Sequence, residues 1–153
     1  MKKNLRTITL MVLVMVMLVS GIIPAAAAPE TDSIIYLEDG SYITVELEII
    51  ENRAAGTKTG SKTYRYKGSD GVEEWNAVLT GIFTYTGTGA TCNSAGCSVT
   101  ISDTAWYLIS KTSNRSGSSA VGEVTMGRKF LGITIDEETL EMRITCDANG
   151  NLS

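Results

Sequence analysis

The sequence predicts an all-β fold: an antiparallel β-sandwich, immunoglobulin-like or similar, of about six or seven strands behind an N-terminal signal peptide helix. Three observations predict it. Apolar and polar residues alternate along most of the chain after residue 27, as they do in strands with one buried face. Glycine-containing turn sequences separate these segments. No later stretch shows the 3.6-residue period of an amphipathic helix. A small barrel fits the same pattern, and we favour the sandwich.

The first 27 residues predict a secretory signal peptide. Basic residues precede an apolar run at residues 8–19, and alanines at 25–27 supply the small side chains that signal peptidase accepts. A retained membrane anchor is the alternative, because a spanning helix needs about 20 apolar residues. A glycine and a proline near the end of the run disfavour an anchor. We therefore expect cleavage after Ala27, a secreted extracellular product and no membrane attachment after cleavage.

The rest of the chain, residues 28–153, predicts a single small all-β domain. An N-terminal strand region covers residues 34–53 and the main body covers residues 57–146. The whole chain has 13 basic and 17 acidic residues, and removal of the signal peptide takes away three basic ones, so the acidic excess rises from 4 to 7. Because an acidic chain repels phosphate backbones, we expect no nucleic-acid partner.

The first strongly predicted strand is residues 42–50, which follow a turn at Asp39-Gly40. One face of this strand is apolar and carries Ile43, Val45, Leu47 and Ile49. A segment of mostly small and polar residues at 53–60 predicts a surface loop, and residues 68–71 predict a turn.

The next strand is long, and its core face carries Trp75, Ala77, Leu79, Gly81, Phe83 and Tyr85. Val78 and Ile82 on its other face predict that the strand is covered on both sides. After a break at residues 87–89, the apolar phase at Val99 is opposite to that at Trp106, and a β-bulge near Asp103 would reconcile the two phases.

The last part of the chain predicts a serine-rich loop at residues 110–119, a turn at Leu131-Gly132 and two strands. The first of these strands has Ala120, Gly122, Val124 and Met126 on its core face, and the second has Leu140, Met142, Ile144 and Cys146. The predicted core aromatics are Trp75, Phe83, Trp106 and Phe130. An exposed aromatic platform for sugar is the alternative interpretation of these aromatic residues.

Three cysteines, Cys92, Cys97 and Cys146, allow at most one intramolecular disulfide, which an exported protein is expected to form. Cys92 and Cys97 could face each other across a four-residue loop at residues 93–96. Cys146 shares the core phase of the last strand and could instead pair with either of them, closing a loop of about fifty residues with Cys92. The pairing stays open, and three cysteines without histidine make a poor zinc site.

Four segments carry a resemblance to a known group of proteins. They are EDGSYI at 38–43, TKTGSKTY at 57–64, LTGIFTY at 79–85 with ATC at 90–92, and TCDANG at 145–150. On these segments the chain resembles an uncharacterised family, a domain of unknown function, of small secreted proteins from Gram-positive, mainly clostridial, bacteria. The resemblance implies export, a β fold and a shared C-terminal boundary. It implies no activity and no catalytic residue.

The composition excludes several kinds of chemistry. The chain has no histidine, so Ser-His-Asp and Cys-His catalysis, histidine-based zinc sites and haem ligation by histidine are excluded. We predict no catalytic, cofactor-binding or metal-binding residues and no cofactor. Glu73 and Glu74 lie beside Trp75, but adjacent strand residues point to opposite faces and do not act on one bond. Residues 147–151 predict a terminal turn rather than a calcium loop.

The leading functional hypothesis is a secreted, non-catalytic interaction module. Its partner would be an extracellular protein or an envelope component, bound through loops or a strand edge, and its oligomeric state is open. The alternative is a secreted antagonist, either a bacteriocin-like toxin or a hydrolase inhibitor. A third hypothesis is an enzyme without histidine that acts on glycans through paired carboxylates.

Overall fold

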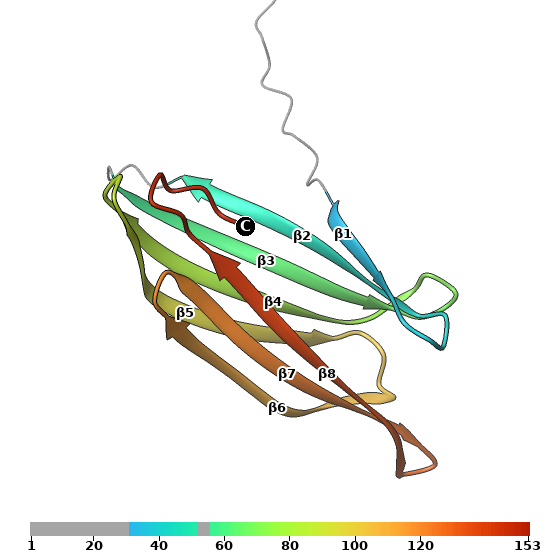
Figure 1. Cartoon of the computed structure of the whole chain (residues 1–153). Helices are drawn as coiled ribbons and strands as arrows, with labels where there is room; N and C mark the ends of the chain where they lie inside the picture. The colour runs from blue at the N-terminus through green and yellow to red at the C-terminus, as the bar shows by residue number, and fades with distance from the viewer. Residues whose placement is uncertain (1–30, 52–55) are drawn as a thin grey trace, which may run out of the picture.

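The structure, a computed structural model, describes residues 31–51 and 56–153. The predicted signal peptide and its cleavage site lie outside the described residues. Within them the chain forms eight antiparallel strands in two sheets and no helix (Figure 1). The predicted all-β antiparallel sandwich is thus confirmed, with eight strands in place of the expected six or seven.

Each sheet is a meander, in which strands that are neighbours in the sequence are also neighbours in space. The five-stranded sheet contains β1 (Thr31–Tyr36), β2 (Tyr42–Glu51), β3 (Thr57–Lys67), β4 (Glu73–Tyr85) and β5 (Ala90–Ile101). The three-stranded sheet contains β6 (Trp106–Ser116), β7 (Ser119–Phe130) and β8 (Ile133–Thr145). This connectivity differs from the Greek key of immunoglobulin domains.

The smaller sheet packs face to face on the larger one (Figure 1). Strands β7 and β8 lie across β4, and β8 also reaches β3. The chain passes from one sheet to the other between β5 and β6, through residues 102–105. The far end of the β7–β8 hairpin extends past the body of the sandwich (Figure 1).

The core lies between the sheets and takes most of the side chains that alternation predicts, but Ile49 near the end of β2 is 45% exposed. Trp75, Phe83 and Trp106 are buried, as predicted. The Tyr66 ring stacks on Trp75 at 5.2 Å between centroids and meets Trp106 edge-on at 5.1 Å. The predicted core faces of β7 and β8 are also buried, and they carry Ala120, Gly122, Val124, Met126, Leu140, Met142, Ile144 and Cys146.

Gly81 lets the two sheets approach closely at the centre of this core. A Cβ at this position would lie 2.5 Å from Cζ of Phe83 and 3.0 Å from Cβ of Ala120 on β7. The Phe83 ring therefore covers Gly81 of its own strand. No larger residue fits at position 81 without displacing that ring.

Two predictions about the middle of the chain are wrong. The phase change before Trp106 is not a β-bulge, because residues 102–105 carry the chain to the other sheet, where the inward direction is reversed. The outer face of β4 is not covered, and Ile82 is exposed there. A side chain in the correct phase for an outer face stays exposed when no third layer packs on it.

Two predicted loops are shorter than expected. Strand β3 begins at Thr57, so only part of the 53–60 segment is a connection, and residues 52–55 lie outside the described residues. The serine-rich segment 110–119 is strand except for a turn at Gly117-Ser118. Serine and threonine are compatible with strands that have one solvated face, so composition alone misidentified this hairpin.

The C-terminal segment folds back as the predicted turn. The Asp147 carboxylate accepts hydrogen bonds from the backbone N–H groups of Asn149 and Asn151 at 2.8 Å and from the Asn151 amide at 2.7 Å. These bonds, first among them the one from the Asn151 side chain, hold the pKa of Asp147 below its usual value. Leu152 then returns to bridge Cys146 and packs into the core.

Candidate functional site

The β7–β8 hairpin ends in a tight turn of two residues. Phe130 pairs with Ile133, and Leu131 and Gly132 connect them with φ angles of 51° and 80°. Positive φ at both central residues is the pattern of a type I′ turn, whose twist matches that of the flanking strands. The turn predicted at Leu131-Gly132 is therefore confirmed.

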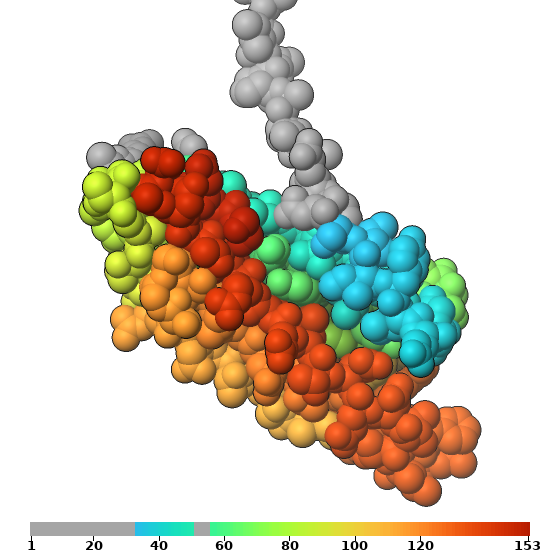
Figure 2. All heavy atoms as spheres, viewed as in Figure 1, coloured from blue at the N-terminus to red at the C-terminus, as the bar shows by residue number. Residues whose placement is uncertain are grey.

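The end of this hairpin is apolar and exposed. Phe130 is 64% exposed, Leu131 88%, Ile133 69% and Ile135 59%. We call these four residues the apolar tip. They belong to the part of the hairpin that projects from the molecule, coloured dark orange at the lower right of Figure 2. Single exposed apolar residues are common, but a group of four large ones on a projection indicates a binding surface.

Phe130 is a correction to the sequence prediction, which placed it in the core. Its strand has already left the sandwich when it reaches this residue, so there is no opposite sheet to cover the ring. The signal that would have identified the tip is the run of four apolar or turn residues, Phe130 to Ile133, which breaks the strand alternation. Two residues later come the acidic residues Asp136, Glu137 and Glu138.

Leu131 occupies an unfavourable backbone conformation. Glycine, asparagine and aspartate are the usual residues at this turn position, because positive φ brings the Cβ of other residues close to the backbone. Leu131 is the non-glycine residue with positive φ among those that the structure describes. A strained residue that also exposes its side chain indicates a functional constraint rather than a contribution to folding.

The base of the hairpin is braced against β6. Tyr107 lies across from Gly127, where a Cβ would come within 2.5 Å of the tyrosine ring. The Tyr107 hydroxyl hydrogen-bonds the Thr134 hydroxyl at 2.8 Å, and the Lys129 ammonium lies 4.2 Å from the Tyr107 ring centroid. The hairpin therefore presents the apolar tip on a supported arm.

The charges behind the tip are divided between the two strands. On β7, Lys129 lies over Tyr107, and Arg128 lies 5.7 Å from the Trp106 ring and 4.0 Å from Glu74. On β8, Asp136, Glu137 and Glu138 form what we call the acidic flank. Burial raises the pKa of Glu138, and the charges of Asp136 and Asp39 raise it further. The three acidic residues of the flank therefore all lie on β8.

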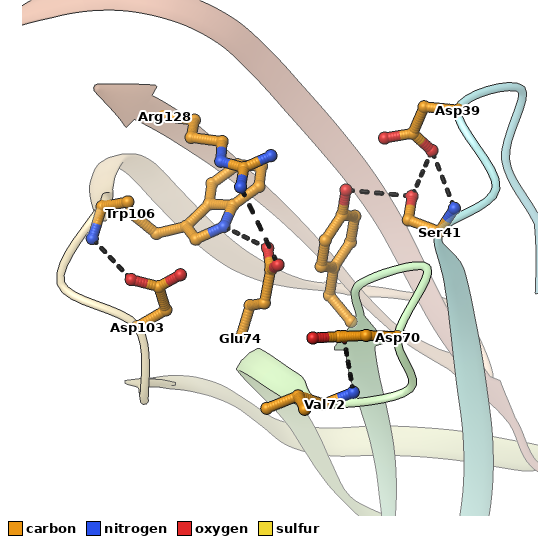
Figure 3. A network of polar contacts seen from close by, with 10 residues as sticks. Asp39, Ser41, Asp70, Val72, Glu74, Asp103, Trp106 and Arg128 are labelled. Carbon is orange, nitrogen blue, oxygen red and sulfur yellow. Dashed lines mark hydrogen bonds and ion pairs between the residues drawn. The ribbon is translucent and has the colours of Figure 1, made fainter. Parts of the chain in front are cut away.

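A polar pocket of about 230 Å³ lies at the same end of the sandwich (Figure 3). Its acidic groups are held by neighbouring parts of the chain. Asp39 accepts hydrogen bonds from the Ser41 hydroxyl and N–H, which hold the pKa of Asp39 low. Asp70 accepts from the Val72 N–H at 3.0 Å, and Glu74 accepts from the Trp106 indole at 2.6 Å. These bonds fix the turns and the aromatic cluster, so we assign the pocket a structural role.

A second hollow, of about 390 Å³, lies on the outer face of the three-stranded sheet. Glu123 on β7 and Glu141 on β8 are directly opposite each other across the strands and both line it. Both residues are exposed, so water solvates the two carboxylates. Exposed like charges in register destabilise a sheet slightly and do not by themselves form a site.

The structure places the carboxylates of Glu73 and Glu74 in separate networks. Glu73 pairs with Arg65 at 3.2 Å and accepts from the Asn76 amide at 2.7 Å. Glu74 is an extra residue of β4 where the register with β3 shifts, and it faces Trp106. A β-bulge of this kind re-aims a side chain. The two carboxylates do not face a common substrate position.

The three cysteines are free thiols in the structure. The predicted hairpin loop between Cys92 and Cys97 is wrong, because both residues lie in the continuous strand β5. Five residues of strand span roughly 16 Å, far more than the Cα separation of a disulfide. In the apparent loop, residues 94–96 pair with β4, and Asn93 is the extra residue where the register shifts.

Comparison of the chain with protein-family models, curated proteins and solved structures finds no match. Family membership therefore stays a prediction from the sequence segments. Among the described residues, no three histidine, cysteine, aspartate or glutamate side chains gather closely enough to hold a metal ion. None of the described segments is a helix that could span a membrane.

Proposed function

We propose that this chain is an exported, non-catalytic interaction module that binds an extracellular protein or envelope protein through the apolar tip. The observation that carries the proposal is Leu131, which is 88% exposed at a φ of 51°. Its side chain weakens the isolated fold in two ways, through backbone strain and through exposed apolar area. Both features are explained if Leu131 enters a pocket on a partner.

The shape and charge of the arm indicate the kind of partner. A narrow convex hairpin fits a concave apolar pocket, and its Phe130 and Leu131 side chains would act as anchors in that pocket. The acidic flank would then lie at the rim, where lysine or arginine side chains of the partner would complement it. We therefore infer a protein partner with an apolar pocket and a basic rim.

The acidic flank also argues against lipid as the partner. Membrane surfaces that are recognised through basic segments carry negative charge. Asp136, Glu137 and Glu138 directly behind the tip would be repelled by such a surface, and the chain as a whole has a net charge of −4. Binding to a protein pocket requires no contact with anionic headgroups.

An antagonist is a second candidate, because the same projection also fits the cleft of a hydrolase. A hairpin that fills a substrate cleft blocks it without any chemistry of its own. This role would use the same apolar tip and the same partner chemistry, and inhibition of the captured enzyme would identify it.

The test compares capture by the wild-type protein and by Leu131→Asn, which suits the type I′ turn and removes the anchor. We expect a protein from culture medium or cell-envelope extract that the wild type retains and Leu131→Asn loses. The matched control is Val72→Ser, because Val72 is also an exposed apolar residue, 60% exposed beside the β3–β4 turn. This control should capture the same protein as the wild type.

Three results would contradict the proposal. The first is equal capture by wild type and Leu131→Asn. The second is flotation of the protein with anionic or zwitterionic phospholipid vesicles, which would make lipid the ligand. The third is concentration-dependent dimerisation that Leu131→Asn abolishes, which would make a second copy of the chain the occupant of the tip.

A further inference from the structure

Cys92 and Cys146 lie on either side of the β6–β7 turn. The Cys92 N–H donates to the carbonyl oxygen of Gly117 at 2.9 Å, and the Cys146 N–H donates to that of Ser118 at 3.0 Å. Cys92 belongs to the five-stranded sheet, whereas Cys146 directly follows β8 of the three-stranded sheet. Two consecutive carbonyl groups therefore bring the two cysteines to the same place between the sheets.

Both side chains point into the core at this place. Cys92 is 3% exposed and Cys146 is 2% exposed, and both belong to the core cluster. As thiols they donate to backbone oxygens of their own segments, those of Ser94 and Asp147. Burial raises the pKa of both thiols, and the charges of Asp147 and, to a smaller extent, Cys92 raise the pKa of Cys146 further.

Cys97 lies at a different position along the strands of the sandwich. It pairs with Leu79 on β4, and Leu79 Cδ1 lies within 3.0 Å of the Cβ position of Gly122 on β7. Gly122 in turn pairs with Met142, four residues before Cys146 on the neighbouring strand. Four residues of strand span roughly 13 Å, which is beyond the reach of a disulfide.

We propose that Cys92 and Cys146 form a disulfide that links the two sheets, and that Cys97 remains a thiol. The proposal rests on the export that the proposed function includes, because disulfides persist in oxidising compartments, but it does not depend on the apolar tip. Of the three pairings that three cysteines allow, the fold favours this one.

The oxidation requires an acceptor of two electrons, and a small-molecule disulfide such as oxidised glutathione suffices. The thiolate of one cysteine attacks glutathione disulfide and releases one glutathione thiol. The thiolate of the second cysteine then attacks the mixed disulfide and releases the other glutathione. The two cysteines lose two protons and two electrons in total, and one glutathione disulfide becomes two thiols.

The experiment counts free thiols after refolding the mature chain in a glutathione redox buffer. Monomeric protein is unfolded without reductant, alkylated and weighed by intact mass spectrometry. We expect one alkylated cysteine in the wild type, none in Cys97→Ser, and two in each of Cys92→Ser and Cys146→Ser. Refolding in a defined buffer makes the result independent of export and of partner binding.

Other thiol counts would overturn the proposal. Three alkylated cysteines in the wild type would show that no bridge forms. No alkylated cysteine in Cys92→Ser would show a bridge between Cys97 and Cys146, and none in Cys146→Ser would show a bridge within β5. The double variant Cys92→Ala/Cys146→Ala tests whether the fold forms without the bridge. Its melting temperature should equal that of the reduced wild type and should not change with reductant.

Discussion

Leu131 shows how a single residue can separate stability from binding. In the αL region an L-residue other than glycine is strained by roughly 1–2 kcal/mol, and asparagine tolerates this region better than leucine. We therefore expect Leu131→Asn to raise the free energy of unfolding by about 0.5–1 kcal/mol. Urea denaturation of the two proteins under the same redox conditions measures this difference.

The same substitution has a useful control at the neighbouring position. Phe130→Ser removes another exposed apolar side chain of the tip, but from an extended strand position, so we expect it to weaken capture without the gain in stability. A loss of stability in Leu131→Asn would mean that the leucine side chain supports the fold by more than its backbone strain costs.

Glu138 provides a pH-dependent prediction at the same scale. Its pKa is raised from 4.5 by burial, then by Asp136 and Asp39. A carboxyl group with a raised folded-state pKa favours the folded state when protonated, and this contribution is lost as the pH rises from the unfolded pKa through the folded one. Glu138→Gln should therefore be more stable than wild type at pH 7, by a few tenths of a kcal/mol, which is typical of partly exposed charges.

The advantage of Glu138→Gln should disappear near pH 3, where the wild-type carboxyl is protonated in both states. Thermal melts across this pH range measure it. Glu48→Gln is the control for the change in net charge, because Glu48 is an exposed residue on β2. An equal gain in both variants would assign the effect to the overall negative charge rather than to the burial of Glu138 and its neighbours Asp136 and Asp39.

At the scale of the strands, Gly81 sets how closely β4 approaches β7. Gly81→Ala places a methyl group against the buried Phe83 ring, and overpacking of this kind costs roughly 1–3 kcal/mol of unfolding free energy. Gly96→Ala on the adjacent strand is the control, since a Cβ at that position meets no atom within 4 Å. Chemical denaturation should show a clear loss only for Gly81→Ala, and equal losses would contradict the close-approach argument.

Strand faces were predictable from the sequence where a strand stays in one sheet. Leu140, Met142 and Ile144 alternate with polar residues, and the structure buries all three. The prediction failed where neighbours decide the outcome. Ile82 and Phe130 have the residue type of buried positions, yet no layer covers either one. Alternation specifies which face a side chain occupies, and only the packing of sheets decides whether that face is buried.

At the scale of the whole molecule, the division of the strands between two sheets was not predictable from periodicity. The four residues between Ile101 and Trp106 carry the chain across the sandwich, and their sequence resembles an ordinary turn. The apolar tip is a consequence of this arrangement, because the far end of the β7–β8 hairpin extends past the body of the sandwich (Figure 1). The pairing of Cys92 with Cys146 likewise follows from how the sheets face each other.

The proposed disulfide makes a final prediction about global stability. It would close a loop of about fifty residues that contains β6, β7 and β8, and the loss of chain entropy in the unfolded state would stabilise the fold by about 4 kcal/mol. For a domain of this size, reduction should lower the melting temperature by roughly 10–15 °C. Calorimetry of Cys97→Ser with and without reductant measures the effect without interference from the third thiol. The disulfide would anchor the smaller sheet, which has only three strands, to the larger one. A melting temperature unchanged by reductant would therefore mean that packing alone holds the two sheets together.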